Sequence, residues 1–167
     1  MAQTSYSNTL SAAYEGYIAD SESSRVMPLR NSIGSTQPYG RAVCFSTTEG
    51  DFRACAATRV LAGILVRAND HELDASGLPA SEVGNILVEG SAWVVVEENV
   101  VPGNPVRVRL TAGSGETVGA FRTGADSTDC ALIPNAVYET AASTSGLARV
   151  RINLPGTSAT MALTADA

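Results

Sequence analysis

The sequence contains no lysine, because each of its 11 basic residues is an arginine. The simpler explanation is a genome rich in G and C. The other is a use of arginine at interfaces, where its planar guanidinium forms paired hydrogen bonds with carboxylates. Charge of either sign is also scarce, at 17% of the 167 residues. A surface so poor in charge is expected to be covered in part by a partner or to be rich in small polar residues.

A basic surface is missing too. The net charge is −6 and the sequence pI is about 4.7. A protein that binds a phosphate backbone is expected to be basic, so we expect no nucleic-acid partner. No apolar run approaches the roughly 18 residues of a membrane span, and the N-terminus lacks the basic and apolar pattern of a signal peptide. We therefore expect no membrane association.

Cysteine is present only as Cys44, Cys55 and Cys130. The count is odd and the spacing matches no zinc motif. We expect three reduced thiols in a cytosolic product, and neither a structural metal nor a cofactor.

Catalytic patterns are weak or absent. The only histidine, His71, lies on a loop with Asp70, Glu72 and Asp74, where a solvated acidic loop is expected rather than a metal or acid–base site. Glu97 and Glu98 are adjacent, so on a strand they point to opposite faces and cannot act as paired carboxylates. We therefore predict that the protein is not an enzyme and has no catalytic residues.

The glycine-rich stretch 113–119 lacks the lysine of a phosphate loop, and no nucleophile elbow is present. A weaker alternative is a hydrolase that uses the acidic residues around His71.

What the sequence does contain is a series of short strand patterns separated by turns of glycine, proline and serine. The stretch Ile86–Leu110 has β-branched residues and the only tryptophan, Trp93, in its first half. Its second half alternates apolar residues with arginines. We predict two antiparallel strands joined by the turn at 99–104, with Trp93 buried on the inner face.

Other strands are expected at 41–45, 58–67, 117–122, 130–133, 136–142 and 147–154. Gly63 lies inside one of them and indicates a bulge or a close approach of backbone. This pattern predicts an all-β fold, either a small β-barrel or a jelly-roll-like sandwich with an extended N-terminal arm. The expected division is an arm at 1–36, a β-domain at 37–156 and a tail at 157–167.

Two groups of residues are candidates for contact with a partner. The first is aromatic, because tyrosine buries a large area at low entropic cost; it comprises Tyr6, Tyr14, Tyr17 and Tyr39. Residues 11–20 could form a short helix within the arm. The second group would form an outward basic stripe on neighbouring strands; it comprises Arg107, Arg109, Arg149 and Arg151. The alternatives are an unstructured leader and ordinary solvated strand faces.

The chain contains several short motifs at the stretch 2–9, at 13–16 and 19–20, and at the proline–aromatic–glycine turn at 38–43. Further motifs lie at 62–64, 101–103, 106–109 and 146–151. Together these motifs resemble a known family, the structural cement or decoration proteins of tailed-bacteriophage heads. Residues 68–85 and 111–130 match no motif of the family.

The resemblance implies a small β-barrel or jelly-roll-like domain on the exterior of a phage capsid. Such a protein would clamp the phage major capsid protein as a homo-oligomer, a dimer or trimer at a symmetry axis, and would be assembled in the bacterial host cytoplasm. The alternative is a virion-associated β-sandwich that binds a carbohydrate or a receptor.

Overall fold

The computed structural model describes residues 13–19, 24–67, 77–113, 115–154 and 162–166. Within these ranges the chain forms strands and no helix, which confirms the all-β fold, and no segment there could cross a membrane as a helix. The strands are β1 (Arg25–Asn31), β2 (Gln37–Pro38), β3 (Ala42–Phe45), β4 (Asp51–Ala54), β5 (Leu61–Val66), β6 (Gly77–Leu78), β7 (Val83–Val95), β8 (Pro105–Arg109), β9 (Phe121–Arg122), β10 (Cys130–Tyr138) and β11 (Leu147–Asn153).

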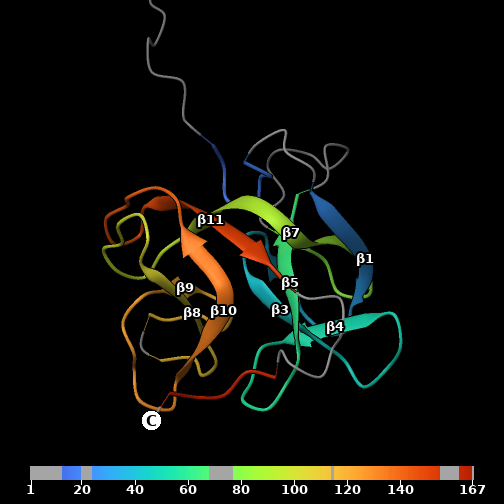
Figure 1. Ribbon diagram of the computed structural model, residues 1–167. Coiled ribbons are helices and arrows are strands. Elements are labelled where there is room, and N and C mark those ends of the chain that lie inside the picture. The colour runs from blue at the N-terminus through green and yellow to red at the C-terminus, as the bar shows by residue number, and fades with distance from the viewer. Residues whose placement is uncertain (1–12, 20–23, 68–76, 114, 155–161, 167) are drawn as a thin grey trace, which may run out of the picture.

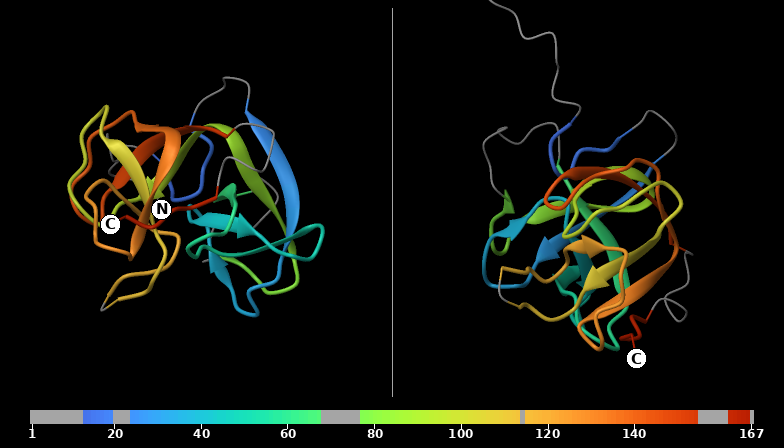
Figure 2. Two further views of the ribbon diagram at one scale, coloured as in Figure 1. Left: turned by 60° about the horizontal axis from the view of Figure 1, so that its bottom comes forward. Right: turned by 90° about the vertical axis from the view of Figure 1, so that its left-hand side faces the viewer.

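The strands form two lobes that share the long strand β7 (Figures 1 and 2). In the first lobe, β1 pairs with both β4 and β7, so the order β1-β4-β3-β5-β7 closes on itself. In the second lobe, the order β7-β11-β10-β8-β9 is closed by a bridge from Val96 to Phe121. We call these the first ring and the second ring. The small pair β2–β6 adds Leu78 to the first ring's core.

Strand β7 bends where it passes from one ring to the other. Its pairing with β1 shifts register between Arg25 and Val26, which leaves one extra residue on β7. Gly90 follows with a φ of +124°, a conformation that side chains other than glycine rarely adopt. Beyond this point β7 pairs with β11. The bulge and the glycine therefore let one strand serve both rings.

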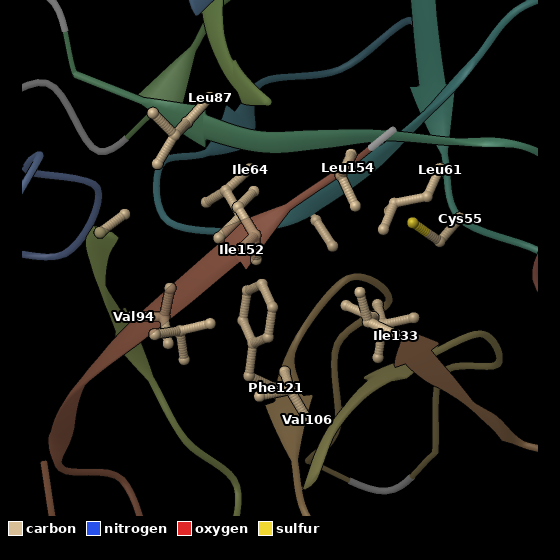
Figure 3. Packing of buried hydrophobic residues seen from close by; sticks show 14 of the residues in the cluster. Cys55, Leu61, Ile64, Leu87, Val94, Val106, Phe121, Ile133, Ile152 and Leu154 are labelled. Atoms are coloured by element: carbon tan, nitrogen blue, oxygen red, sulfur yellow. The ribbon is translucent and has the colours of Figure 1, made fainter. Parts of the chain in front are cut away.

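Two clusters of buried side chains stabilise the rings. Ile86, Phe52 and Leu65 belong to the smaller cluster inside the first ring. The larger cluster fills the second ring and the contact between the rings, and Phe121 lies at its centre among residues of several strands (Figure 3). Strand β5 is buried on both faces, because alternate residues enter the two clusters. The core is therefore continuous across the lobes.

Several expected strands are confirmed, and the expected role of Gly63 is confirmed in both respects. The pairing of β3 with β5 shifts register opposite this glycine, and a Cβ there would lie 2.1 Å from the carbonyl oxygen of Leu87. The expected strand at 147–154 is also present, and it alternates, since Val150 and Ile152 are buried while Arg151 and Asn153 are exposed.

The predicted hairpin at 86–110 is wrong. Strand β7 pairs with β1, β5 and β11, whereas β8 pairs with β10 and β9. The turn at 99–104 thus carries the chain across the second ring rather than folding it back on the same strand. Register on a strand rich in apolar residues on both faces cannot be fixed from local pattern alone.

The prediction that strands begin near Arg41 is also wrong, because β1 lies within the segment assigned to the arm and closes the first ring. The side chain of Leu29 in β1 is buried in the core of the first ring. Residues 13–19 form a turn and a bridge, not the expected helix. The acidic loop around His71 lies outside the described residues.

The C-terminal residues 162–166 tie the two rings together. Ala162 bridges to Val60 in the first ring, and Ala165 bridges to Ala131 in the second. Between them Leu163 is buried in the larger core. This end of the chain contributes to packing beyond the last regular strand.

Candidate functional site

The N-terminal segment 13–19 lies along the second half of β7. The backbone N–H of Gly16 donates to the carbonyl of Trp93 at 2.8 Å, and the N–H of Trp93 donates to the carbonyl of Tyr17 at 2.9 Å. Ile18 forms a bridge with Ala92. The segment thus extends the sheet by backbone hydrogen bonds, which hold its side chains at fixed positions.

Close packing locks the other side of this segment to the first ring. A Cβ on Gly16 would lie 2.6 Å from the Cβ of Tyr39, and one on Gly40 would lie 2.4 Å from the Cγ of Glu15. The Nε of Arg67 donates to the carbonyl of Glu15 at 2.9 Å. Two glycines therefore permit the segment to seat against the turn that precedes β3.

Burial raises the pKa of Glu15, and the guanidinium groups of Arg41 and Arg67 partly oppose this effect. The Nε of Arg41 lies 3.6 Å from a carboxylate oxygen of Glu15. The junction of the segment with the first ring thus contains a partly buried charge between two arginines.

Aromatic side chains gather on the outer face of this region. The rings of Tyr14 and Tyr17 have centroids 6.0 Å apart, and both line a shallow hollow with Trp93. Tyr14 is 59% exposed. The expectation that Trp93 is buried is wrong: its neighbours Ala92 and Val94 point into the core, so Trp93 points out and is half-buried. The side chains of this strand alternate between its two faces, but Val94 faces the core and Trp93 faces outward, the reverse of the prediction.

Two of the predicted arginines lie on the same outer face. Arg149 is opposite Trp93 in the pairing of β11 with β7, and Arg151 is opposite Ser91. Residues opposite each other in an antiparallel pair lie side by side on one face. We call the surface formed by these side chains the outer β7–β11 face; its members are Tyr14, Tyr17, Trp93, Arg149 and Arg151.

The charges of this face are partly balanced. A carboxylate oxygen of Glu139 lies 2.7 Å from the Nε of Arg149 and accepts a hydrogen bond from the hydroxyl of Ser91 at 2.9 Å. The other carboxylate oxygen lies 3.9 Å from Arg151, whose side chain is 54% exposed. The face therefore combines aromatic area with oriented guanidinium groups, a composition typical of protein interfaces.

The remaining predicted contact residues lie elsewhere. Tyr39 is 2% exposed and lies under the guanidinium of Arg67, 4.7 Å from the ring centroid, so it is not a surface residue. Tyr6 lies outside the described residues.

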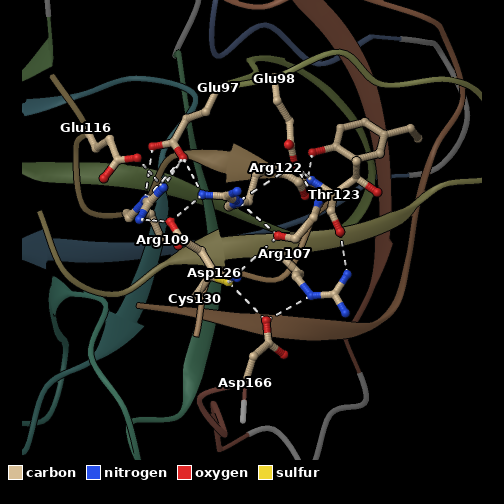
Figure 4. Close-up of polar contacts among 12 residues, drawn as sticks. Glu97, Glu98, Arg107, Arg109, Glu116, Arg122, Thr123, Asp126, Cys130 and Asp166 are labelled. Carbon is tan, nitrogen blue, oxygen red and sulfur yellow. Dashed lines mark hydrogen bonds and ion pairs between the residues drawn. The ribbon is translucent and has the colours of Figure 1, made fainter. Parts of the chain in front are cut away.

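The outward basic stripe is wrong for Arg109, whose side chain is 1% exposed. Its guanidinium lies 2.9 Å from Glu97, 2.6 Å from Glu116 and 2.8 Å from Asp126 (Figure 4). The chain after β8 covers the outer face of this strand and brings the last two carboxylates onto the arginine. Both faces of β8 are therefore covered, and alternation alone could not reveal it.

Other polar groups extend this network through the second ring. Asp126 also lies 2.8 Å from Arg122, and Asp166 lies 2.9 Å from Arg107 (Figure 4). Glu97 and Glu98 were expected on opposite faces, but both follow β7 and both approach Arg122, at 3.7 Å. We call this set the arginine network; its members are Glu97, Glu98, Arg107, Arg109, Glu116, Arg122, Asp126 and Asp166.

The network shifts the ionisation of its members. Hydrogen bonding to Arg109 holds the pKa of Asp126 below its usual range. Burial raises the pKa of the Cys130 thiol to about 11, and the hydrogen bond to Asp166 adds to this effect. Each arginine faces carboxylates, so the arrangement stabilises charges rather than creating a reactive group. No group of three metal-binding side chains occurs within the described ranges.

One feature of the sequence could have predicted this network, although overall composition does not show it. Carboxylates are dense on both sides of β8, at Glu97, Glu98, Glu116 and Asp126, around the only two arginines of that strand. Carboxylates in such excess indicate pairing rather than an exposed basic stripe.

The comparison with protein families decides the identity. The family model described as structural cement protein (E217 gp24/Pam3 gp6) matches residues 2–153. The chain belongs to this family. The cement protein therefore has a structural role in decorating and stabilising a phage capsid, and it is a component of the virion.

A solved structure supports the fold of the cement protein. A chain of the capsid of Myoviridae phage XM1 superposes with a TM-score of 0.70, at 19% sequence identity, over 90% of this chain and 96% of that one. No curated protein matched the sequence. The two-ring architecture is thus that of a protein found in another phage capsid.

Proposed function

We propose that the outer β7–β11 face is the surface through which this cement protein contacts the phage major capsid protein. The observation that carries the proposal is the aromatic group formed by the exposed Tyr14 and the half-buried Tyr17 and Trp93, held in place by backbone pairing. Aromatic residues and arginine supply much of the binding energy at protein interfaces. Because the backbone of this face is already ordered, little entropy is lost when it binds.

The cement protein acts without catalysis, on the exterior of the head. Each copy bridges neighbouring capsid subunits, and the subunits separate only after the bridge detaches. The acidic net charge of −6 supports the absence of a nucleic-acid partner, and neither a membrane nor a cofactor is needed for this role. Assembly takes place in the bacterial host cytoplasm, where the capsid forms.

Copies of the cement protein associate as a homo-oligomer, a dimer or trimer at a symmetry axis of the head. The scarcity of charge, at 17% of residues, supports a surface that is partly covered by other subunits. Sedimentation equilibrium of the purified chain measures the number of copies, and a monomer at the concentrations used for decoration would contradict this part of the proposal.

Binding to heads that lack the cement protein tests the surface. We expect Tyr14→Ala combined with Trp93→Ala to lower the number of bound copies strongly, because truncating an aromatic hot-spot residue costs about 2 kcal/mol or more, or roughly 30-fold in affinity. Bound copies are counted from the ratio of cement to major capsid protein after the heads are purified, and the heat resistance of the heads is measured in parallel.

Val83→Ala is the matched control, because Val83 is a 60% exposed apolar residue at the other end of β7. It should bind as the unmodified protein does. Normal occupancy by the aromatic double variant would contradict the proposed surface and would move the contact to another face. If the unmodified protein does not bind heads but does bind a glycan or a receptor, the result would favour the alternative function, a β-sandwich module that binds a carbohydrate or a receptor.

A further inference from the structure

The first ring holds two thiols in direct contact. The sulfur atoms of Cys44 and Cys55 lie 3.3 Å apart, and both side chains are buried. Cys44 lies within β3 opposite Arg53, two residues before Cys55. Cys55 directly follows the last residue of β4, and the chain at this point places its sulfur against that of Cys44. Figure 3 shows the side chain of Cys55 at the edge of the larger core.

We propose that Cys44 and Cys55 form an intramolecular disulfide when the protein leaves a reducing environment, and thereby cross-link β3 to the end of β4. A disulfide requires a sulfur–sulfur distance of about 2.05 Å, so the sulfurs must approach by about 1.2 Å from the observed contact. Cys55 can make this movement, because β4 ends at Ala54 and the next residue is outside the strand ladder. The inference does not depend on how the protein binds a capsid.

The reaction needs a two-electron oxidant, and hydrogen peroxide is the smallest one that balances it. The thiolate of one cysteine attacks a peroxide oxygen, which gives a sulfenic acid and hydroxide; the hydroxide takes up a proton to become water. The second thiolate attacks the sulfenic sulfur and displaces a second hydroxide, which also leaves as water. Two thiols and one peroxide thus give one disulfide and two waters.

The surroundings make this reaction slow rather than forbidden. The hydrogen bond with Cys44 and burial both raise the pKa of the Cys55 thiol, so little thiolate exists at neutral pH. The rate should therefore rise as the pH is raised. Cys130 offers an internal comparison, because its sulfur lies 3.0 Å from a carboxylate oxygen of Asp166 in the second ring and contacts no other cysteine among the described residues.

The test uses the full-length protein, purified with a reductant, freed from it and incubated with hydrogen peroxide at neutral and mildly alkaline pH. We expect the intact mass to fall by two hydrogen atoms and peptide mapping to show Cys44 linked to Cys55. The cross-link closes a short loop, so the melting temperature should rise by about 5–10 °C and return to its first value on reduction.

Variants locate the effect. Cys130→Ala should form the link and gain the same thermal stability, whereas Cys44→Ala should gain neither. Peptide mapping of the unmodified protein identifies the linked cysteines directly, so the test remains valid even if a variant does not fold. Three free thiols after prolonged oxidation, a link that involves Cys130, or a link without a rise in melting temperature would each overturn the proposal.

Discussion

The two rings share β7 but are closed by different interactions. The first ring is closed by backbone pairing of β1 with both β4 and β7, around an apolar core that contains Phe52. Among the described residues, the ends of the second ring are joined by the single bridge from Val96 to Phe121, and a buried arginine with three carboxylates lies beside that closure. One ring thus depends on strand pairing and apolar packing, and the other adds ionic contacts at its seam.

This difference predicts how each ring fails. Apolar packing varies little with pH, whereas a buried arginine is stable only while its carboxylates are charged. The seam of the second ring should therefore be the part of the molecule most sensitive to the loss of one charge.

The largest expected effect is that of Arg109→Ala. Removal of this guanidinium takes away the contact between Arg109 and Glu116 and leaves Arg122 as the arginine near Glu97 and Asp126. Loss of one partner of a buried ion pair typically costs about 3–5 kcal/mol. Urea unfolding measures the free energy of unfolding. Hydrogen exchange should show greater loss of protection in β8 and β9 than in β3 and β4.

Two controls frame this result. Phe52→Ala should cost a similar ~3–5 kcal/mol but should reduce protection mainly in the first ring. Arg151→Ala removes an exposed arginine and should change stability by no more than about 0.5 kcal/mol. Equal loss of protection in both rings for Arg109→Ala would mean that the molecule has a single cooperative core.

A smaller effect is expected from pH. The pKa of Asp126 is lower in the folded protein than in the unfolded chain, where it is about 3.9, because Arg109 and Arg122 stabilise its charged form. Its contribution to stability is therefore fully present above the unfolded pKa, and is lost as the pH falls through the lowered folded pKa. Asp126→Asn should be less stable than the unmodified protein at pH 6, and the gap should narrow below about pH 4.

Thermal melts of the two proteins across this pH range measure the gap. Glu15 gives a useful contrast, since its pKa is raised by burial in the folded protein. Its protonation on acidification favours the folded state, so it opposes the loss from Asp126. A gap between the unmodified protein and Asp126→Asn that stays constant down to pH 2.5 would contradict the assigned role of Asp126.

Part of the molecule could be predicted from the sequence. Local signals were enough for β3, β5 and β11, because each alternates cleanly or is bounded by turn residues. Gly63 was also informative, because a glycine inside a strand pattern indicates a close approach of backbone, and the carbonyl of Leu87 lies too close for any side chain there. The resemblance at the N-terminus and at the turns also pointed to the correct family.

The errors arose where distant segments decide the outcome. The polar sequence of β1 suggested an arm. The partners that make it a strand are residues of β7 more than 50 positions later in the chain, so no local pattern indicated the pairing. Arg109 alternates like a surface residue, but the covering carboxylates come from segments that carry no regular strand pattern. For Arg109 the local strand conformation was predicted correctly and only its environment was not, whereas for β1 the strand itself was missed because its pairing partners are non-local.

The last comparison of stability concerns two neighbouring residues of β7, the strand that the rings share. Trp93 points away from the core, with Val94 as its inward neighbour. Val94→Ala removes two buried methyl groups and should cost about 1.5 kcal/mol or more. Trp93→Ala should cost less than this, well below the ~3–5 kcal/mol of a buried tryptophan, because the side chain already contacts water in the free protein.

The two substitutions should exchange rank when binding is measured, since Trp93 belongs to the outer β7–β11 face and Val94 does not. Urea unfolding gives the first ranking, and the number of copies bound to undecorated heads gives the second. If Trp93→Ala proves the more destabilising of the two, the hollow formed with Tyr14 and Tyr17 is part of the folded core. The N-terminal segment would then act as a structural strand of the second ring rather than as a surface presented to the capsid.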